Sequence, residues 1–349
     1  MNQNELAKLF NDVFEPKTGE NVLILIDTPH DDIKDNKKWV DRREMAKEWY
    51  NILNQMGKES DFSVDIKEFK ATGMHNGPIP QETLDDAAKA NIVIAMTEFS
   101  GSSSVLHLCK KNPSGFRGIS MPLAERRMEK TAFLANYQDV KKYATDIKKM
   151  LDKAIGAEVD FSTGDKLFID LRNRKGHADT GEFIKPGQSG NFPSGEGYSA
   201  PYEAIGDEVE TFGPSKTKGI WPVKYGEENV KFKVENNRVK EIIGDGPKAA
   251  EMKKFFEEND SRRNVAELGI GCNPKAVVTG NVLEDEKVGL HIAYGNSNHF
   301  DGKVESDMHL DIVYAKNCPI EGKTFTLIYE DKTKIELIQN AELRYDLLK

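Results

Sequence analysis

The sequence has few cysteines, and their positions suit neither a disulfide framework nor a cysteine-rich zinc site. Cys109, Cys272 and Cys318 are an odd number in a chain of 349 residues, and no two of them have C-x-x-C spacing. This usage is typical of a reducing compartment, so we expect a cytoplasmic protein. The chain also has no apolar run long enough to cross a bilayer and no signal-peptide core near its start, so we expect no membrane partner.

Three common enzyme motifs are absent as well. No G-x-G-x-x-G follows the first apolar run, the serines at 100–104 lack the G-x-S-x-G frame, and GIGCNPKAVVTG lacks the lysine–serine pair of a phosphate-binding loop. These absences argue against a dinucleotide enzyme, an α/β-hydrolase and a P-loop nucleotidase. The 49 basic and 58 acidic residues give a net charge of −9, and such a chain is poorly suited to neutralise phosphates, so we expect no nucleic-acid partner.

The apolar pattern differs between the two halves of the chain, which predicts two domains, 1–158 and 159–349. The first half alternates continuous apolar runs such as NVLILID with amphipathic helices, which is typical of an open parallel α/β sheet. The second half is predicted to be a β-rich α+β domain that carries the metal site. Its expected elements are one helix at 247–258 and strands at 166–172, 230–234, 238–243, 265–270, 290–294, 309–314 and 324–329. A helix is also expected at 137–155.

Glu267 is an acidic residue in the middle of an apolar strand, in the segment NVAELGIGCNP. Strand alternation puts it on one face with Val265 and Gly269, a face with room for a ligand. A buried carboxylate without a partner costs several kcal/mol. Glu267 is therefore either a partnered, buried group such as a metal ligand or an exposed acid on an edge strand.

Four further residues extend this pattern to a candidate metal site. His309 and Asp311 form an H-x-D pair on one face of a strand, and His291 lies in a strand with small neighbours. Glu196 lies in a glycine- and proline-rich loop that can aim its carboxylate into a cleft. Each has an ordinary alternative, an exposed loop acid for Glu196 and a core histidine for His291. Two imidazoles and three carboxylates together suit Zn²⁺, Co²⁺, Mn²⁺ or Fe²⁺.

Four segments in the same order, GNFPSGEGYSAP, NVAELGIGCNP, DEKVGLHIAYG and HLDIVY, resemble the M29 family of metallo-aminopeptidases over roughly residues 160–315. The resemblance implies a homodimer that acts on peptides with two divalent ions, Zn, Co or Mn. It also implies that the metal ligands are Glu196, Glu267, His291, His309 and Asp311. Five side chains can hold two ions if Glu267 bridges them, and a shared water would then attack the substrate.

One position departs from the family pattern. Where the family has a catalytic tyrosine, seven residues after the first histidine, this chain has Asn298, followed by His299. Asn298 or His299 is therefore the expected transition-state donor. Two alternatives remain open. A related group opens hydroxypyridine rings with one iron, which His291, His309 and Asp311 would suit, and the fold could also persist as a metal-binding protein without activity.

Overall fold

The computed structural model describes residues 1–348, which divide into two compact units. Unit 1 consists of residues 1–141, 179–194 and 273–277, and unit 2 of residues 142–178, 195–272 and 278–349. The predicted domain boundary after residue 158 stays a prediction, because units defined by contacts need not be folding domains. Within residues 1–348, no helix has the length and apolar content that crossing a bilayer requires.

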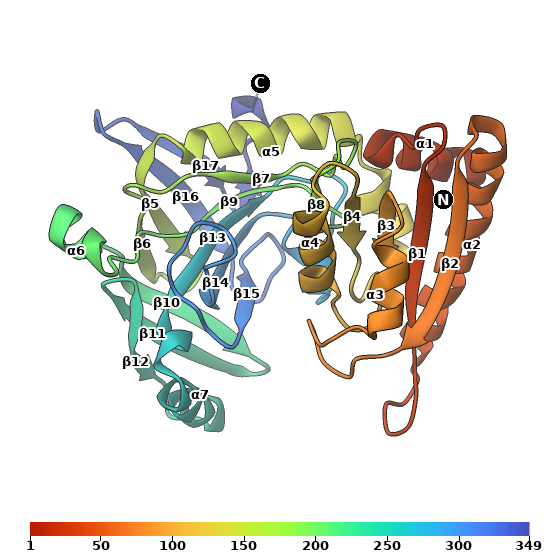
Figure 1. Ribbon diagram of the computed structural model, residues 1–349. Coiled ribbons are helices and arrows are strands. Elements are labelled where there is room, and N and C mark those ends of the chain that lie inside the picture. The colour runs from red at the N-terminus through yellow and green to blue at the C-terminus, as the bar shows by residue number, and fades with distance from the viewer. Residues whose placement is uncertain (349) are drawn as a thin grey trace. The chain divides into compact units, whose positions relative to one another are not determined.

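Unit 1 is built on a five-stranded parallel sheet with the order β2-β1-β3-β4-β8, and Figure 1 shows helices on both of its faces. The strands are β1 (Asn21–Thr28), β2 (Ser63–Lys70), β3 (Ile92–Ala95), β4 (Arg117–Ser120) and β8 (Ser189–Asn191). The helices are α1 (Gln3–Phe14), α2 (Lys37–Ser60), α3 (Gln81–Ala87), α4 (Ser102–Lys111) and the short 3-10 turns η1 (Arg126–Lys130) and η2 (Ala132–Leu134). Strand β1, which lies between β2 and β3, is buried at six successive positions, as expected of a strand covered on both faces.

Unit 2 contains two sheets. The larger has the order β12-β11-β10-β6-β5-β16-β17-β18, and the smaller has the order β15-β14-β13-β9-β7. The larger sheet comprises β5 (Ala154–Phe161), β6 (Lys166–Asp170), β10 (Lys218–Tyr225), β11 (Glu228–Glu235), β12 (Arg238–Ile243), β16 (Gly322–Tyr329), β17 (Lys334–Gln339) and β18 (Glu342–Leu343). The smaller comprises β7 (His177–Asp179), β9 (Glu196–Ser199), β13 (Val265–Gly271), β14 (Leu290–Gly295) and β15 (His309–Val313). The helices are α5 (Tyr137–Leu151), which begins in unit 1, α6 (Asp207–Phe212), α7 (Pro247–Glu258), α8 (Val282–Asp285), η3 (Asp260–Arg263) and η4 (Tyr345–Leu347).

One apolar core joins the two sheets of unit 2. Leu268 and Ile292 of the smaller sheet and Phe325 of the larger belong to the same cluster, and all three are fully buried. Trp221 of β10 packs edge-on against Tyr294 of β14, with ring centroids 6.1 Å apart. The smaller sheet therefore turns one face of alternate residues into this core, which leaves its other face for polar side chains.

The expected fold class, a parallel α/β sheet joined to a β-rich α+β part, is confirmed. The helix expected at 137–155 is wrong at its end, because α5 stops at Leu151 and β5 starts at Ala154. Strand β5 pairs with β6 along one edge and with β16 along the other. Tertiary pairing thus overrides the helical pattern at this boundary.

Candidate metal centre

Strand register brings four of the five predicted ligands together on one face of the smaller sheet. Ala293 of β14 lies opposite Glu267 of β13 on one side and opposite Asp311 of β15 on the other. His291 precedes Ala293 by two residues and His309 precedes Asp311 by two, so both share that face. The opposite face points into the apolar core, so the polar face is the one available for chemistry.

The fifth predicted ligand, Glu196, reaches the same face from β9. It was expected in a loop, but it is the first residue of a strand and is paired opposite Gly271. Glu196 is 8% exposed and Glu267 is 7% exposed, so both residues are buried. The exposed-acid alternatives for Glu196 and Glu267 are therefore wrong.

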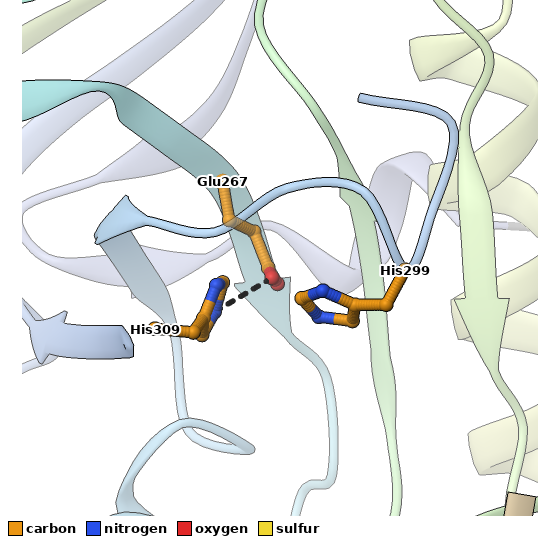
Figure 2. Close-up of side chains that lie close together, drawn as sticks. All are labelled: Glu267, His299 and His309. Carbon is orange, nitrogen blue, oxygen red and sulfur yellow. Dashed lines mark ion pairs between the residues drawn. The ribbon is translucent and has the colours of Figure 1, made fainter. Parts of the chain in front are cut away.

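The carboxylate of Glu267 lies between the two histidines. Its Oε1 is 3.4 Å from Nε2 of His291, and its Oε2 is 3.3 Å from Nε2 of His309. Figure 2 shows the second of these contacts, with His299 on the other side of the carboxylate. Glu196 Oε2 is 3.1 Å from His291 Nε2, and Asp311 Oδ1 is 3.4 Å from His309 Nε2. The five side chains thus form two groups that share Glu267.

The other ring nitrogen of each histidine faces a backbone carbonyl. His309 Nδ1 is 2.6 Å from the oxygen of Asn296, and His291 Nδ1 is 3.4 Å from that of Gly289. When the ring is neutral, a proton on Nδ1 that is donated to the carbonyl leaves the lone pair on Nε2, where the carboxylates lie. This is the usual arrangement of a metal-ligating histidine.

Two buried carboxylate oxygens of the cluster lack hydrogen-bond partners among residues 1–348. They are Glu196 Oε2 and Asp311 Oδ1, the same two atoms that face the histidines. When the facing rings are neutral and protonated on Nδ1, each of these oxygens is an unsatisfied buried acceptor, which costs roughly 1–3 kcal/mol. A divalent cation between these oxygens and the Nε2 atoms would remove that cost, so the residues present fit such an ion.

The charges of this cluster are strongly coupled. Burial raises the pKa of Glu267, but the neighbouring His291 and His309 outweigh it and hold the pKa at about 2. Burial also raises the pKa of Glu196, which Lys287 and His291 bring down to about 2. Burial lowers the pKa values of both histidines, yet the carboxylates beside them raise these pKa values well above 6.5. The carboxylates therefore stay ionised and attract cations.

Two residues of the centre were missed in the sequence. The Lys287 ammonium lies 2.6 Å from Glu196 Oε1 and 2.8 Å from Glu286 Oε1, and its side chain is 1% exposed. Burial, with the charges of Glu196 and Asp311, raises the pKa of Glu286 to about 8 even though Lys287 opposes the shift. The run DEKV resembles an ordinary exposed turn, and only its position directly before a buried strand could have suggested otherwise.

The two predicted catalytic residues have different surroundings. His299 could join Glu267 and His309 in a ligand group whose atoms all lie within 4.8 Å of one another, and its ring centroid is 5.0 Å from that of His309. Both residues are exposed, but Asn298 makes no side-chain hydrogen bond or ion pair within residues 1–348. Both roles stay predictions, and the geometry favours His299.

Two histidines and three carboxylates gathered on one sheet face form a cluster that is suited to hold divalent metal ions, as in a metalloenzyme. A protein-family model described as NicX, 2,5-dihydroxypyridine 5,6-dioxygenase, matches residues 6–321, and the chain belongs to this family. A search of curated proteins gave no match.

Two solved structures share the fold over nearly the whole chain. The 2,5-dihydroxypyridine dioxygenase from Pseudomonas putida KT2440 is 14% identical, with a TM-score of 0.68 over 99% of this chain and 98% of that chain. AmpT from Thermus thermophilus, an M29 aminopeptidase, is also 14% identical, with a TM-score of 0.61 over 98% of this chain and 99% of that chain. At this identity the similarity shows the fold alone. The peptide substrate, the homodimer, the expected absence of nucleic-acid and membrane partners, and the cytoplasmic location stay predictions.

Proposed function

We propose that the protein is an aminopeptidase that removes N-terminal residues from peptides with two divalent cations. The observation that carries this proposal is the placement of Glu267, whose two oxygens face two different histidines at 3.4 and 3.3 Å. A carboxylate in that position suits a bridge between two ions, which a single ion does not need. Zn, Co or Mn would fit the ligand set.

The two groups of side chains indicate which residues would hold each ion. Glu196 and His291 would hold one ion, His309 and Asp311 the other, and Glu267 both. When bound, such a pair supplies an activated water and polarises the substrate carbonyl. His299 beside His309 would donate to the oxygen that becomes negative in the transition state. The free amine of the substrate would bind at the same centre, which restricts cleavage to the N-terminal bond.

The direct test is a panel of fluorogenic aminoacyl substrates with the protein loaded with Zn²⁺, Co²⁺ or Mn²⁺. We expect turnover of substrates with a free amine, no turnover of their N-acetylated forms, and loss of activity after chelation. Equal cleavage of blocked and free substrates would contradict exopeptidase action.

We predict that His299→Ala lowers kcat by about 10²–10³-fold, as loss of one oxyanion donor does, with metal content unchanged. Asn298→Ala is the matched control, because Asn298 is exposed like its neighbour His299 but belongs to no ligand group, and it should leave kcat within about twofold. Steady-state kinetics and metal analysis of both variants decide the assignment. A large effect of Asn298→Ala alone would transfer the role to that residue.

We predict that metal binding weakens as the pH falls. The pKa values of His291 and His309 lie well above 6.5 in the metal-free protein, because buried carboxylates flank both rings. Both rings are then protonated near pH 7 and must release a proton to bind an ion. Each displaced proton changes the affinity by about tenfold per pH unit. Calorimetry at pH 6–8 in buffers of different ionisation enthalpy would measure the released protons, and an affinity independent of pH would refute this prediction.

A second function is favoured by a different observation, the match of residues 6–321 to the dioxygenase family model. In this alternative, one Fe²⁺ held by His291, His309 and Asp311 would serve the opening of a dihydroxypyridine ring with O₂. Metal analysis separates the two proposals: we predict about two Zn, Co or Mn per chain for the peptidase, against about one Fe for the dioxygenase. Oxygen uptake with 2,5-dihydroxypyridine by the iron-loaded protein would overturn the first proposal.

A further inference from the structure

The buried ammonium of Lys287 gives different electrostatic surroundings to the two halves of the metal centre. One half is Glu196 with His291, and the other is His309 with Asp311. The ammonium lies 2.6 Å from Glu196 Oε1 and 2.8 Å from Glu286 Oε1, so one oxygen of Glu196 is already paired with a positive charge that Glu286 also contacts. Only Oε2 remains, and it faces His291 at 3.1 Å. Glu196 can therefore offer only one oxygen to a metal ion. The positive charge of Lys287 stays on its other oxygen.

The other half of the centre has no such cation. Among residues 1–348, the carboxylate of Asp311 pairs only with His309, at 3.4 Å, and its Oδ1 lacks a hydrogen-bond partner. An ion held by Asp311, His309 and Glu267 therefore gains the full charge of Asp311. An ion held by Glu196, His291 and Glu267 is repelled by the ammonium on the far oxygen of Glu196.

From this asymmetry we propose that Lys287 makes the two cation sites unequal, so that the His309–Asp311 site fills first and the Glu196–His291 site binds its ion weakly. This inference rests on the two-ion function proposed above. In a buried site, where charges are screened less than at the surface, a neighbouring unit charge weakens binding of a divalent ion by about 100-fold. The enzyme would thus keep one ion through purification and take up the second only when free metal is abundant.

The decisive experiment is a Co²⁺ titration of the metal-free protein against a calibrated chelator, compared with Lys287→Met. We expect two affinities about 100-fold apart in the unchanged protein. In Lys287→Met the weaker affinity should rise at least tenfold while the tighter one stays within about threefold. The control is Lys303→Met, which removes an ammonium from unit 2 that pairs with Asp207 and Glu208 instead of the centre, and which should change neither affinity.

Two measurements keep the proposal testable if Lys287→Met folds poorly. Anomalous scattering from crystals of the unchanged protein with one equivalent of Co²⁺ should locate the ion beside His309 and Asp311. His309→Ala should remove the tight affinity and His291→Ala only the weak one. A first ion beside His291, or a Lys287→Met protein with the original ratio of affinities, would overturn the role of Lys287. Unequal sites without any peptidase activity would contradict only the proposed function.

Discussion

If the protein is the two-ion aminopeptidase proposed above, Glu267→Gln is expected to prevent the binding of both ions and to lower kcat/KM for aminoacyl substrates by at least about 10⁴-fold. The amide has nearly the same shape as the carboxylate but no charge, and Glu267 belongs to both ligand groups through its two oxygens. Losing the shared ligand therefore weakens both sites at once, and loss of the metal pair removes both the activated water and the polarised carbonyl. Metal analysis after dialysis and steady-state kinetics measure the two effects.

The control for this substitution is Glu208→Gln, a second buried glutamate of unit 2. Its carboxylate pairs with Arg174 at 2.6 Å, and it belongs to neither ligand group. Breaking that pair should destabilise the fold while leaving metal content per folded chain unchanged. If Glu267→Gln lost only one of two ions, Glu267 would be a ligand of a single site and not a bridge.

Gly269→Ala is expected to abolish ion binding beside His291 and to lower activity by about 10³-fold, although it adds a single methyl group. Gly269 lies directly opposite His291 in the β13–β14 pair, and the imidazole lies over it. A Cβ at this position would be 1.9 Å from Nε2 of His291, so the ring must rotate away from Glu196 and Glu267. Because a side chain can move more easily than backbone, the stability cost should be only about 1–3 kcal/mol.

Metal titration and chemical unfolding of Gly269→Ala separate the loss of the site from loss of the fold. Gly101→Ala is the control, because a Cβ there would meet its nearest neighbour, Ile79 Cδ1, at an ordinary 3.5 Å. It should bind metal like the unchanged protein. A Gly269→Ala protein with normal metal content would show that His291 does not ligate from its position over Gly269.

Much of the chain's organisation was predictable because it depends on local patterns. The apolar run of β1 and the hairpin of β11 and β12 follow from burial and turn signals within a few residues. The end of α5 and the start of β5 were not predictable in this way. Ala154–Phe161 is a strand because β6 and β16 pair with its two edges, and those partners come from distant parts of the sequence.

The residues of the candidate site also differ in how far the sequence predicts their positions. Alternation along a strand is local, so His309 and Asp311, or Glu267 and Gly269, can be assigned to one face from the sequence. Lys287 could not be assigned to the site from the sequence. Its hydrogen-bond partner Glu196 is 91 residues away along the chain, and a charged turn normally faces water.

The sequence by itself determined the fold class and the kinds of candidate ligand, two imidazoles and three carboxylates, most of them with strand spacing. Only the tertiary structure decided that Glu267 lies between both histidines and that an ammonium occupies one oxygen of Glu196. The physical reason is that register between strands sets which distant residues become neighbours, and a shift of one residue would turn every one of these side chains to the other face.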